Sequence, residues 1–159
     1  MNKLIVISIF GLLLFGLATE SVAQSISSNQ TELIKKQVDS IFSKMVDSAE
    51  KLEFEKLHSG VNDTHAAGFI ANGKYYASYS ILAEETKLLA QGISEQKISF
   101  KDKKITVLSD KIVLVTASGV SKVYLDDGRE LVVNFLWSFL YEKITNDWKV
   151  VYSHQSTER

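Results

Sequence analysis

Hydrophobic positions in the first half of the chain recur with the period of a helix. Asn29 is the predicted N-cap of the first helix, with Glu32 as its partner in a variant capping box. The helix is expected to run to about Lys51, and its apolar side chains follow a helical spacing at Ile34, Val38, Ile41, Phe42, Met45, Ala49 and Leu52. A shorter helix is predicted over 53–59, and a third from Ser78 to near Gly92.

The second half of the chain changes to strand-like segments. Four long runs, separated by tight-turn sequences, are predicted as antiparallel neighbours and cover 96–109, 111–125, 130–144 and 147–156. Asn72-Gly73 marks a hairpin before the third helix. The order helix, helix, hairpin, helix and four strands predicts an α+β fold in which a curved antiparallel sheet wraps around three N-terminal helices.

The last predicted strand contains a histidine near its end. Strict alternation places Trp148, Val150, Tyr152 and His154 on one face. We expect that face to point into the interior, with Tyr152 and His154 at its polar end. His154 in such a position could act as a general base, or it could be a structural residue hydrogen-bonded to a backbone carbonyl.

The preceding strand, 130–144, has two different faces. Its odd positions are strongly aromatic and are expected to meet the helices. The even positions mix apolar Val132, Leu136 and Leu140 with polar Asn134 and Ser138. A face of this composition suits a homodimer interface, so self-association is predicted.

The N-terminus has the pattern of a secretory signal peptide. A positive start and an apolar run over 4–18 precede the small residues Ser21 and Ala23, which predicts cleavage between Ala23 and Gln24. The run is shorter than the ~18–20 residues that span a bilayer, although a retained membrane anchor is the alternative. We therefore expect a signal peptide over 1–23 and a single domain over 24–159, exported to the bacterial periplasm or secreted.

Composition narrows the classes of partner. A net charge of −1 gives no reason to expect nucleic acid, and no membrane association is expected after cleavage. The spacing of His58, Asp63 and His65 does not place two ligands on one helical face, so no metal site is predicted. The sequence predicts no cofactor, and the absence of cysteine leaves the domain without disulfides.

Three helices, a hairpin at Asn72-Gly73 and a C-terminal meander that ends in the strand 148–156 resemble the nuclear transport factor 2-like superfamily, in its SnoaL-like branch. Trp148, Val150, His154 and Ser156 match the family's final-strand signature, and Tyr152 replaces its usual first histidine. The resemblance implies a cone-shaped α+β fold with a pocket at its wide end. Its members include isomerases, hydratases and cyclases as well as binding and oligomerisation modules, so the fold does not decide the activity.

Two functions follow as hypotheses. The first is non-catalytic binding of a small, partly apolar molecule in the cone, with ligand-binding residues Tyr75, Trp137, Tyr152 and His154. The second is an isomerase, hydratase or cyclase that uses Asp63 or His154 as its general base. Asp63 could instead only shape a turn, and the aromatic residues could belong to the core or to a dimer interface.

Overall fold

The computed structural model describes residues 26–158, which begin with one long helix, α1 (Ser28–Glu50). Its buried apolar positions recur every four residues and form one stripe: Ile34, Val38, Phe42 and Val46. The predicted cap at Asn29 is wrong by two residues. Ser27 has an extended backbone and its side chain accepts a hydrogen bond from the backbone N–H of Gln30 at 3.2 Å, whereas Asn29 already lies inside the helix.

The short elements between α1 and the long strands follow the predicted order. They are α2 (Phe54–Ser59), the 3₁₀ turn η1 (Asp63–His65), β1 (Gly68–Ala71), β2 (Lys74–Tyr76) and α3 (Tyr79–Leu89). Leu52 separates α1 from α2 with a left-handed φ of 56°. Asn72 and Gly73 also have positive φ values, 49° and 81°, as expected for a two-residue hairpin turn. The predicted second helix, hairpin and third helix are therefore confirmed.

Long strands complete the sheet: β3 (Ile93–Val107), β4 (Ile112–Leu125), β5 (Glu130–Ile144) and β6 (Asp147–Glu158). The strand order is β2-β1-β6-β5-β4-β3. The four long strands pair antiparallel with their sequence neighbours, as predicted, whereas β1 pairs parallel with β6. The α+β class with a curved sheet is confirmed, and among the described residues the β1–β6 pair is the one parallel pair of strands, beside an isolated parallel bridge between Val61 and Val150.

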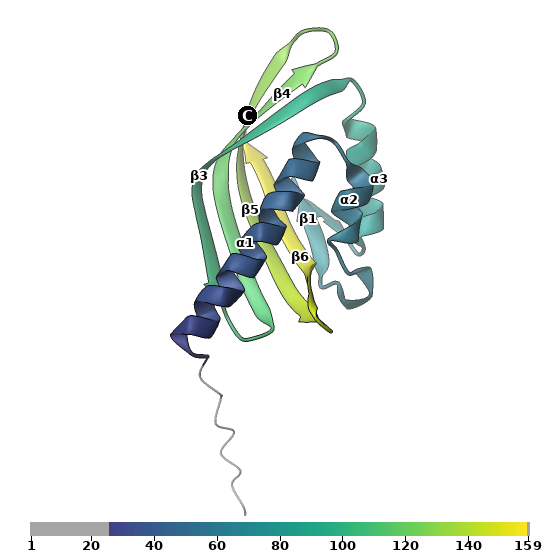
Figure 1. The fold of residues 1–159 in the computed structure, drawn as a ribbon. Helices are drawn as coiled ribbons and strands as arrows, with labels where there is room; N and C mark the ends of the chain where they lie inside the picture. Colours follow the sequence, from purple (N-terminus) through teal and green to yellow (C-terminus); the bar gives the residue numbers. More distant parts are fainter. Residues whose placement is uncertain (1–25, 159) are drawn as a thin grey trace, which may run out of the picture.

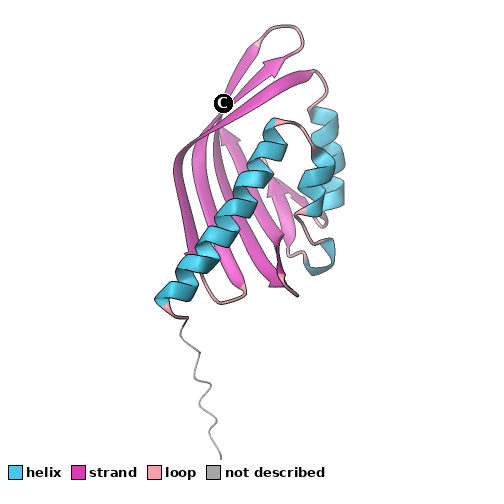
Figure 2. Cartoon of the chain, viewed as in Figure 1, coloured by secondary structure: helices cyan, strands magenta, loops and turns pink. Residues whose placement is uncertain are grey.

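Helices cover only the concave face of the bent sheet. Figure 1 shows α1 crossing this face diagonally, while α2 and α3 lie together at the side of β1. Figure 2 shows no helix of the described residues on the opposite, convex side of the sheet. The hydrophobic core therefore forms between the helices and the concave face, and its large members are Phe42, Phe69, Phe135, Phe139, Tyr141 and Trp148.

A β-bulge in β6 changes the predicted faces of that strand. Tyr141 pairs with Val150, but its neighbour Leu140 pairs with Tyr152, so Val151 is an extra residue on β6. Cross-strand partners share a face, and one inserted residue moves every later side chain to the other face. Trp148 and Val150 therefore point into the core, as predicted.

Tyr152 and His154 do not face the interior, and that prediction is wrong. Tyr152 pairs with Leu140 and His154 with Ser138, on the convex side of the sheet. Ser153 takes the interior position beside buried Phe139 and is 1% exposed. The alternation read from the sequence fails here because the bulge lies between Val150 and Tyr152.

Gly119 lies where β4 passes closest to the aromatic core. A Cβ atom at this position would be 2.1 Å from the carbonyl oxygen of Ser99 and 2.7 Å from the ring of Phe135. Both distances are shorter than any van der Waals contact, so only glycine fits at this point of the strand.

Within residues 26–158, no helix is long and apolar enough to cross a membrane. The predicted signal peptide, 1–23, and its cleavage site lie outside the described residues.

Candidate functional site

The carboxylate of Asp63, a predicted general base, is hydrogen-bonded to the start of helix α3. It accepts hydrogen bonds from the backbone N–H groups of Tyr79 at 2.6 Å and Ser80 at 3.2 Å, and from the Ser80 hydroxyl at 2.7 Å. The N-cap residue, Ser78, makes no side-chain cap of its own. Asp63 therefore caps α3 from the separate turn η1, and its negative charge lies at the positive end of the helix.

The surroundings of Asp63 favour its ionised form. Burial raises the pKa of this carboxyl, but the hydrogen bonds from Ser80 and Tyr79 and the nearby His58 outweigh that effect, so its pKa lies below the ordinary value of 3.8. The negative charge of Asp63 also affects the phenol of Tyr79: burial and the Asp63 carboxylate raise the pKa of Tyr79 to about 12. A carboxylate held in this way is a weak base and a good helix cap.

Asp63→Ala is expected to lower the free energy of unfolding by about 1 kcal/mol, because two N–H groups of α3 lose their acceptor. Part of this loss depends on pH. Since the folded-state pKa is depressed, the stabilisation is complete above about pH 4 and is lost as the pH falls through the folded-state value. The pH-dependent part of the stabilisation is measured by urea denaturation of the wild type and of Asp63→Asn, each at about pH 7 and about pH 3. An equal loss of stability in both proteins on acidification would contradict the assigned role.

The two histidines near Asp63 have different partners. His58 Nε2 lies 3.9 Å from Asp63 Oδ2, and His65 Nδ1 lies 3.6 Å from Glu142 Oε2. His58 also borders a small hollow of about 80 Å³ between α2 and α3, whose wall includes Ser80 and Lys87. Within residues 26–158, no group of three potential metal ligands comes together.

Three of the predicted site residues gather on the convex face. Tyr75 pairs with Ile70, and Ile70 pairs with His154, so Tyr75 lies on the same side as His154. The Tyr75 ring passes over Gly68, which pairs with Tyr152. Tyr75, Tyr152 and His154 therefore lie close together on the outside of the sheet.

The structure separates the two predicted general bases. Asp63 belongs to the helical side, where Tyr79 packs edge-on against buried Phe69 at 5.6 Å between ring centroids. Phe69 pairs with Ser153 on the concave face, whereas His154 projects from the convex face. Because the sheet lies between them, Asp63 and His154 do not converge on one cavity.

Trp137, a predicted ligand-binding residue, lies in an aromatic cluster inside the cone. Its ring stacks on Phe135 with centroids 4.0 Å apart, and it meets Phe139 edge-on at 6.0 Å. Phe100 and Phe42 continue the cluster toward α1. These rings lie in the region in which the sequence predicted a ligand. Trp137 is partly buried there and packs against its aromatic neighbours.

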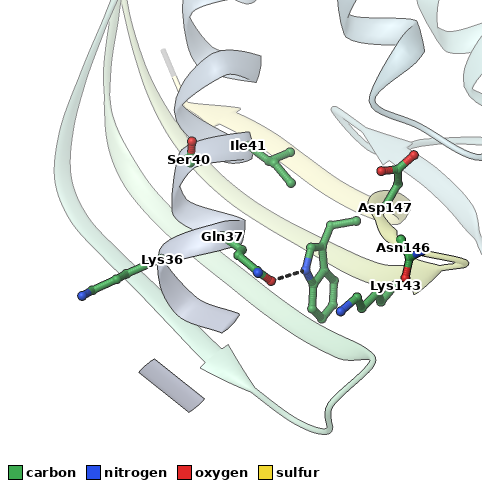
Figure 3. Close-up of a pocket in the computed structure, with 8 residues that line it drawn as sticks. Lys36, Gln37, Ser40, Ile41, Lys143, Asn146 and Asp147 are labelled. Atoms are coloured by element: carbon green, nitrogen blue, oxygen red, sulfur yellow. Dashed lines mark hydrogen bonds between the residues drawn. The ribbon is translucent and has the colours of Figure 1, made fainter. Parts of the chain in front are cut away.

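A different hollow lies between α1 and the β5–β6 hairpin. It is an open groove of about 460 Å³, within the range typical of small-molecule sites. Helix α1 and the hairpin line it with Lys36, Gln37, Ser40, Ile41, Lys143, Asn146, Asp147 and Trp148. Figure 3 shows Gln37 on the helix and Lys143 and Asn146 on the hairpin, and its dashed line marks the hydrogen bond between Gln37 and Trp148.

Trp148 and Gln37 hold the wall of this groove in one arrangement. The indole Nε1–H donates to Gln37 Oε1 at 3.2 Å, and Trp148 is 5% exposed. Lys143 pairs with Trp148 in the sheet and carries its ammonium over the indole ring, 5.9 Å from the centroid. The groove thus combines an aromatic wall and the apolar Ile41 with amide and ammonium donors.

The sequence analysis did not identify Gln37 or Lys143 as site residues. Trp148 was placed on the interior face, which the register confirms, but it was not assigned to a site. A usable signal was present: Lys143 and Trp148 flank the Thr145-Asn146 turn, and in a hairpin they must pair. The contribution of α1 had no such local signal.

Solved structures with the same fold come from several bacteria. A proposed scytalone dehydratase from Novosphingobium aromaticivorans has a TM-score of 0.74 and 8% identity, over 84% of this chain and 89% of that chain. A nuclear transport factor 2-like superfamily protein from Salmonella enterica has a TM-score of 0.71 and 16% identity, over 81% and 94%. A hexachlorocyclohexane dehydrochlorinase, LinA type 3, from Novosphingobium barchaimii has a TM-score of 0.68 and 12% identity, over 84% and 92%.

This likeness shows that the chain has the nuclear transport factor 2-like fold, as predicted. No family model and no curated protein matches the sequence. The fold is shared by a dehydrochlorinase, a proposed dehydratase and a protein of unknown function, so it does not assign an activity. The SnoaL-like branch stays a prediction.

Proposed function

We propose that this protein binds a small, partly apolar molecule without transforming it, and that it does so in the groove between α1 and the β5–β6 hairpin. This keeps the predicted function but moves its site. The observation that carries the proposal is the groove itself, with a hydrogen-bonded tryptophan in its wall and about 460 Å³ of space. In the cone interior, where the ligand was expected, Phe100, Phe135 and Trp137 pack against one another.

The positions of the acid–base candidates support binding over catalysis. An isomerase, hydratase or cyclase needs an acid and a base in defined geometry around one substrate. Asp63 serves as a helix cap, and His154 lies on the opposite side of the sheet. Neither residue lines the groove.

We also propose that two copies associate through the convex face. Leu114, Leu140 and Tyr152 form an apolar row across three neighbouring strands. Leu136 and Val132 extend this patch along β5 and are 65% and 57% exposed. A second copy would bury these side chains on a surface that no helix of the described chain covers.

Export is proposed on the sequence pattern alone. The small-residue site at Ser21 and Ala23 supports removal of 1–23, so the binding protein would act in the periplasm or outside the cell.

Binding in the groove is testable through Trp148. The chain has two tryptophans, so ¹⁵N–¹H spectra should contain two indole signals, and Trp137→Phe assigns them. In a screen of small, partly apolar molecules, we expect at least one to shift the Trp148 signal and to raise the melting temperature. Gln37→Ala should weaken that binding by about tenfold, because the indole loses its partner and its fixed position.

The control for this screen is Asn134→Ala, on the convex face of β5, which should leave binding unchanged. Ligands that stabilise the protein without affecting the Trp148 indole would place the site elsewhere and overturn the proposal.

A further inference from the structure

The groove contains a lysine whose charge has no partner. Lys143 pairs in the sheet with buried Trp148, so it extends from the concave face, and it is only partly exposed. Among residues 26–158, no carboxylate lies within 4 Å of its ammonium. Asp147 belongs to the same groove, but Figure 3 shows its carboxylate directed away from Lys143.

Lys103 provides an internal comparison. It also extends from the concave face, where it pairs with buried Ala117, and its ammonium lies 5.8 Å from the centroid of the Phe42 ring. Helix α1 supplies Lys103 with a counter-charge, because Asp39 accepts a hydrogen bond from it at 2.5 Å. The same helix places Gln37 beside Trp148, and an amide carries no charge.

Gln37, on α1, provides a second hydrogen-bond donor in the groove. Because an indole can only donate, Gln37 must present its oxygen to Trp148, which leaves its amide N–H groups free to donate. Within the described residues these N–H groups have no protein acceptor. The Gln37 amide at the N–H edge of the indole and the Lys143 ammonium over its ring therefore both belong to this groove, with Ile41 as an apolar neighbour (Figure 3).

We propose that the ligand is a small carboxylic acid with an apolar body, a proposal that rests on the groove being the binding site. Its carboxylate pairs with Lys143 and accepts a hydrogen bond from the Gln37 amide, and so takes the place that Asp39 has at Lys103. Its apolar body covers Ile41 and the accessible edge of Trp148. Charge-assisted hydrogen bonds of this kind are stronger than neutral ones, so the acid is favoured over an uncharged isostere.

The test compares three probes of one shape: 2-naphthoate, 2-naphthamide and 2-naphthylmethylamine. Calorimetric titration of the purified protein should show that the carboxylate binds about tenfold more tightly than the amide, and the amine most weakly. Lys143→Gln should abolish this preference, while Lys143→Arg should keep it. The matched control is Lys103→Gln, which removes the concave-face lysine that is paired with Asp39. This variant should still bind the carboxylate more tightly than the amide.

Equal binding of the acid and the amide, or a preference that survives in Lys143→Gln, would overturn the carboxylate inference. The Trp148 indole signal separates this failure from a failure of the proposed function. If the naphthalene probes leave that signal unchanged while other molecules of the screen shift it, the groove is a binding site for a different class. If nothing shifts it, both proposals are wrong.

Discussion

Phe42→Ala is expected to lower the free energy of unfolding by about 3–5 kcal/mol, a large share of the stability of an ordinary domain. Phe42 is fully buried in the middle of α1. Its ring contacts Phe100 and Phe139 at centroid distances of 5.6 and 5.9 Å, and so joins α1 to β3 and β5. Truncation leaves a cavity that these stiff rings cannot collapse to fill.

The matched control is Leu33→Ala, on the same helix but 57% exposed. It removes a similar apolar side chain and should cost less than about 0.5 kcal/mol. Chemical denaturation of both variants measures the difference. A cost for Phe42→Ala near that of Leu33→Ala would mean that α1 does not depend on this contact with the sheet.

Leu136→Glu is expected to convert the proposed dimer to a monomer and to weaken self-association by about 100-fold or more. Leu136 lies in the middle of the convex face and is 65% exposed in the single chain, so the fold tolerates the change. In a dimer, the new carboxylate would be buried without a partner on each copy, which is costly. Light scattering across a range of protein concentrations measures the mass directly.

Leu88→Glu is the control for the dimer test. Leu88 is similarly exposed, at 63%, but it belongs to α3 on the helical layer, so the same charge there should leave the mass unchanged. A wild-type protein that stays monomeric at high micromolar concentration would remove the convex face as an interface. Loss of the dimer in Leu88→Glu alone would move the interface to α3.

Much of the candidate site was beyond prediction because it depends on pairing between distant segments. The interior placement of Tyr152 and His154 fails at the bulge beside Val151, which is created by the pairing of β6 with β5. The capping role of Asp63 requires α3, which begins sixteen residues later. Neither the extra residue nor the cap has a signature in the segment that contains it.

Secondary structure and its order were determined by the sequence alone. Helix α1 follows from the spacing of residues such as Val38 and Phe42, and the β1–β2 hairpin from Asn72-Gly73, because periodicity and turn preference act between residues close in the chain. The order of these elements determined the α+β class.

Tertiary structure alone decided where a ligand can fit. How much space the cone leaves depends on the packing of Phe42, Phe100, Phe135 and Trp137, which come from three separate elements and contact one another there. The size of the groove depends on the distance between α1 and the β5–β6 hairpin. Whether the charge of Lys143 is paired depends on which residue of α1 lies beside this part of the sheet, and that residue is Gln37. These are distances between segments about a hundred residues apart, and they are set by packing, on which local patterns carry no information.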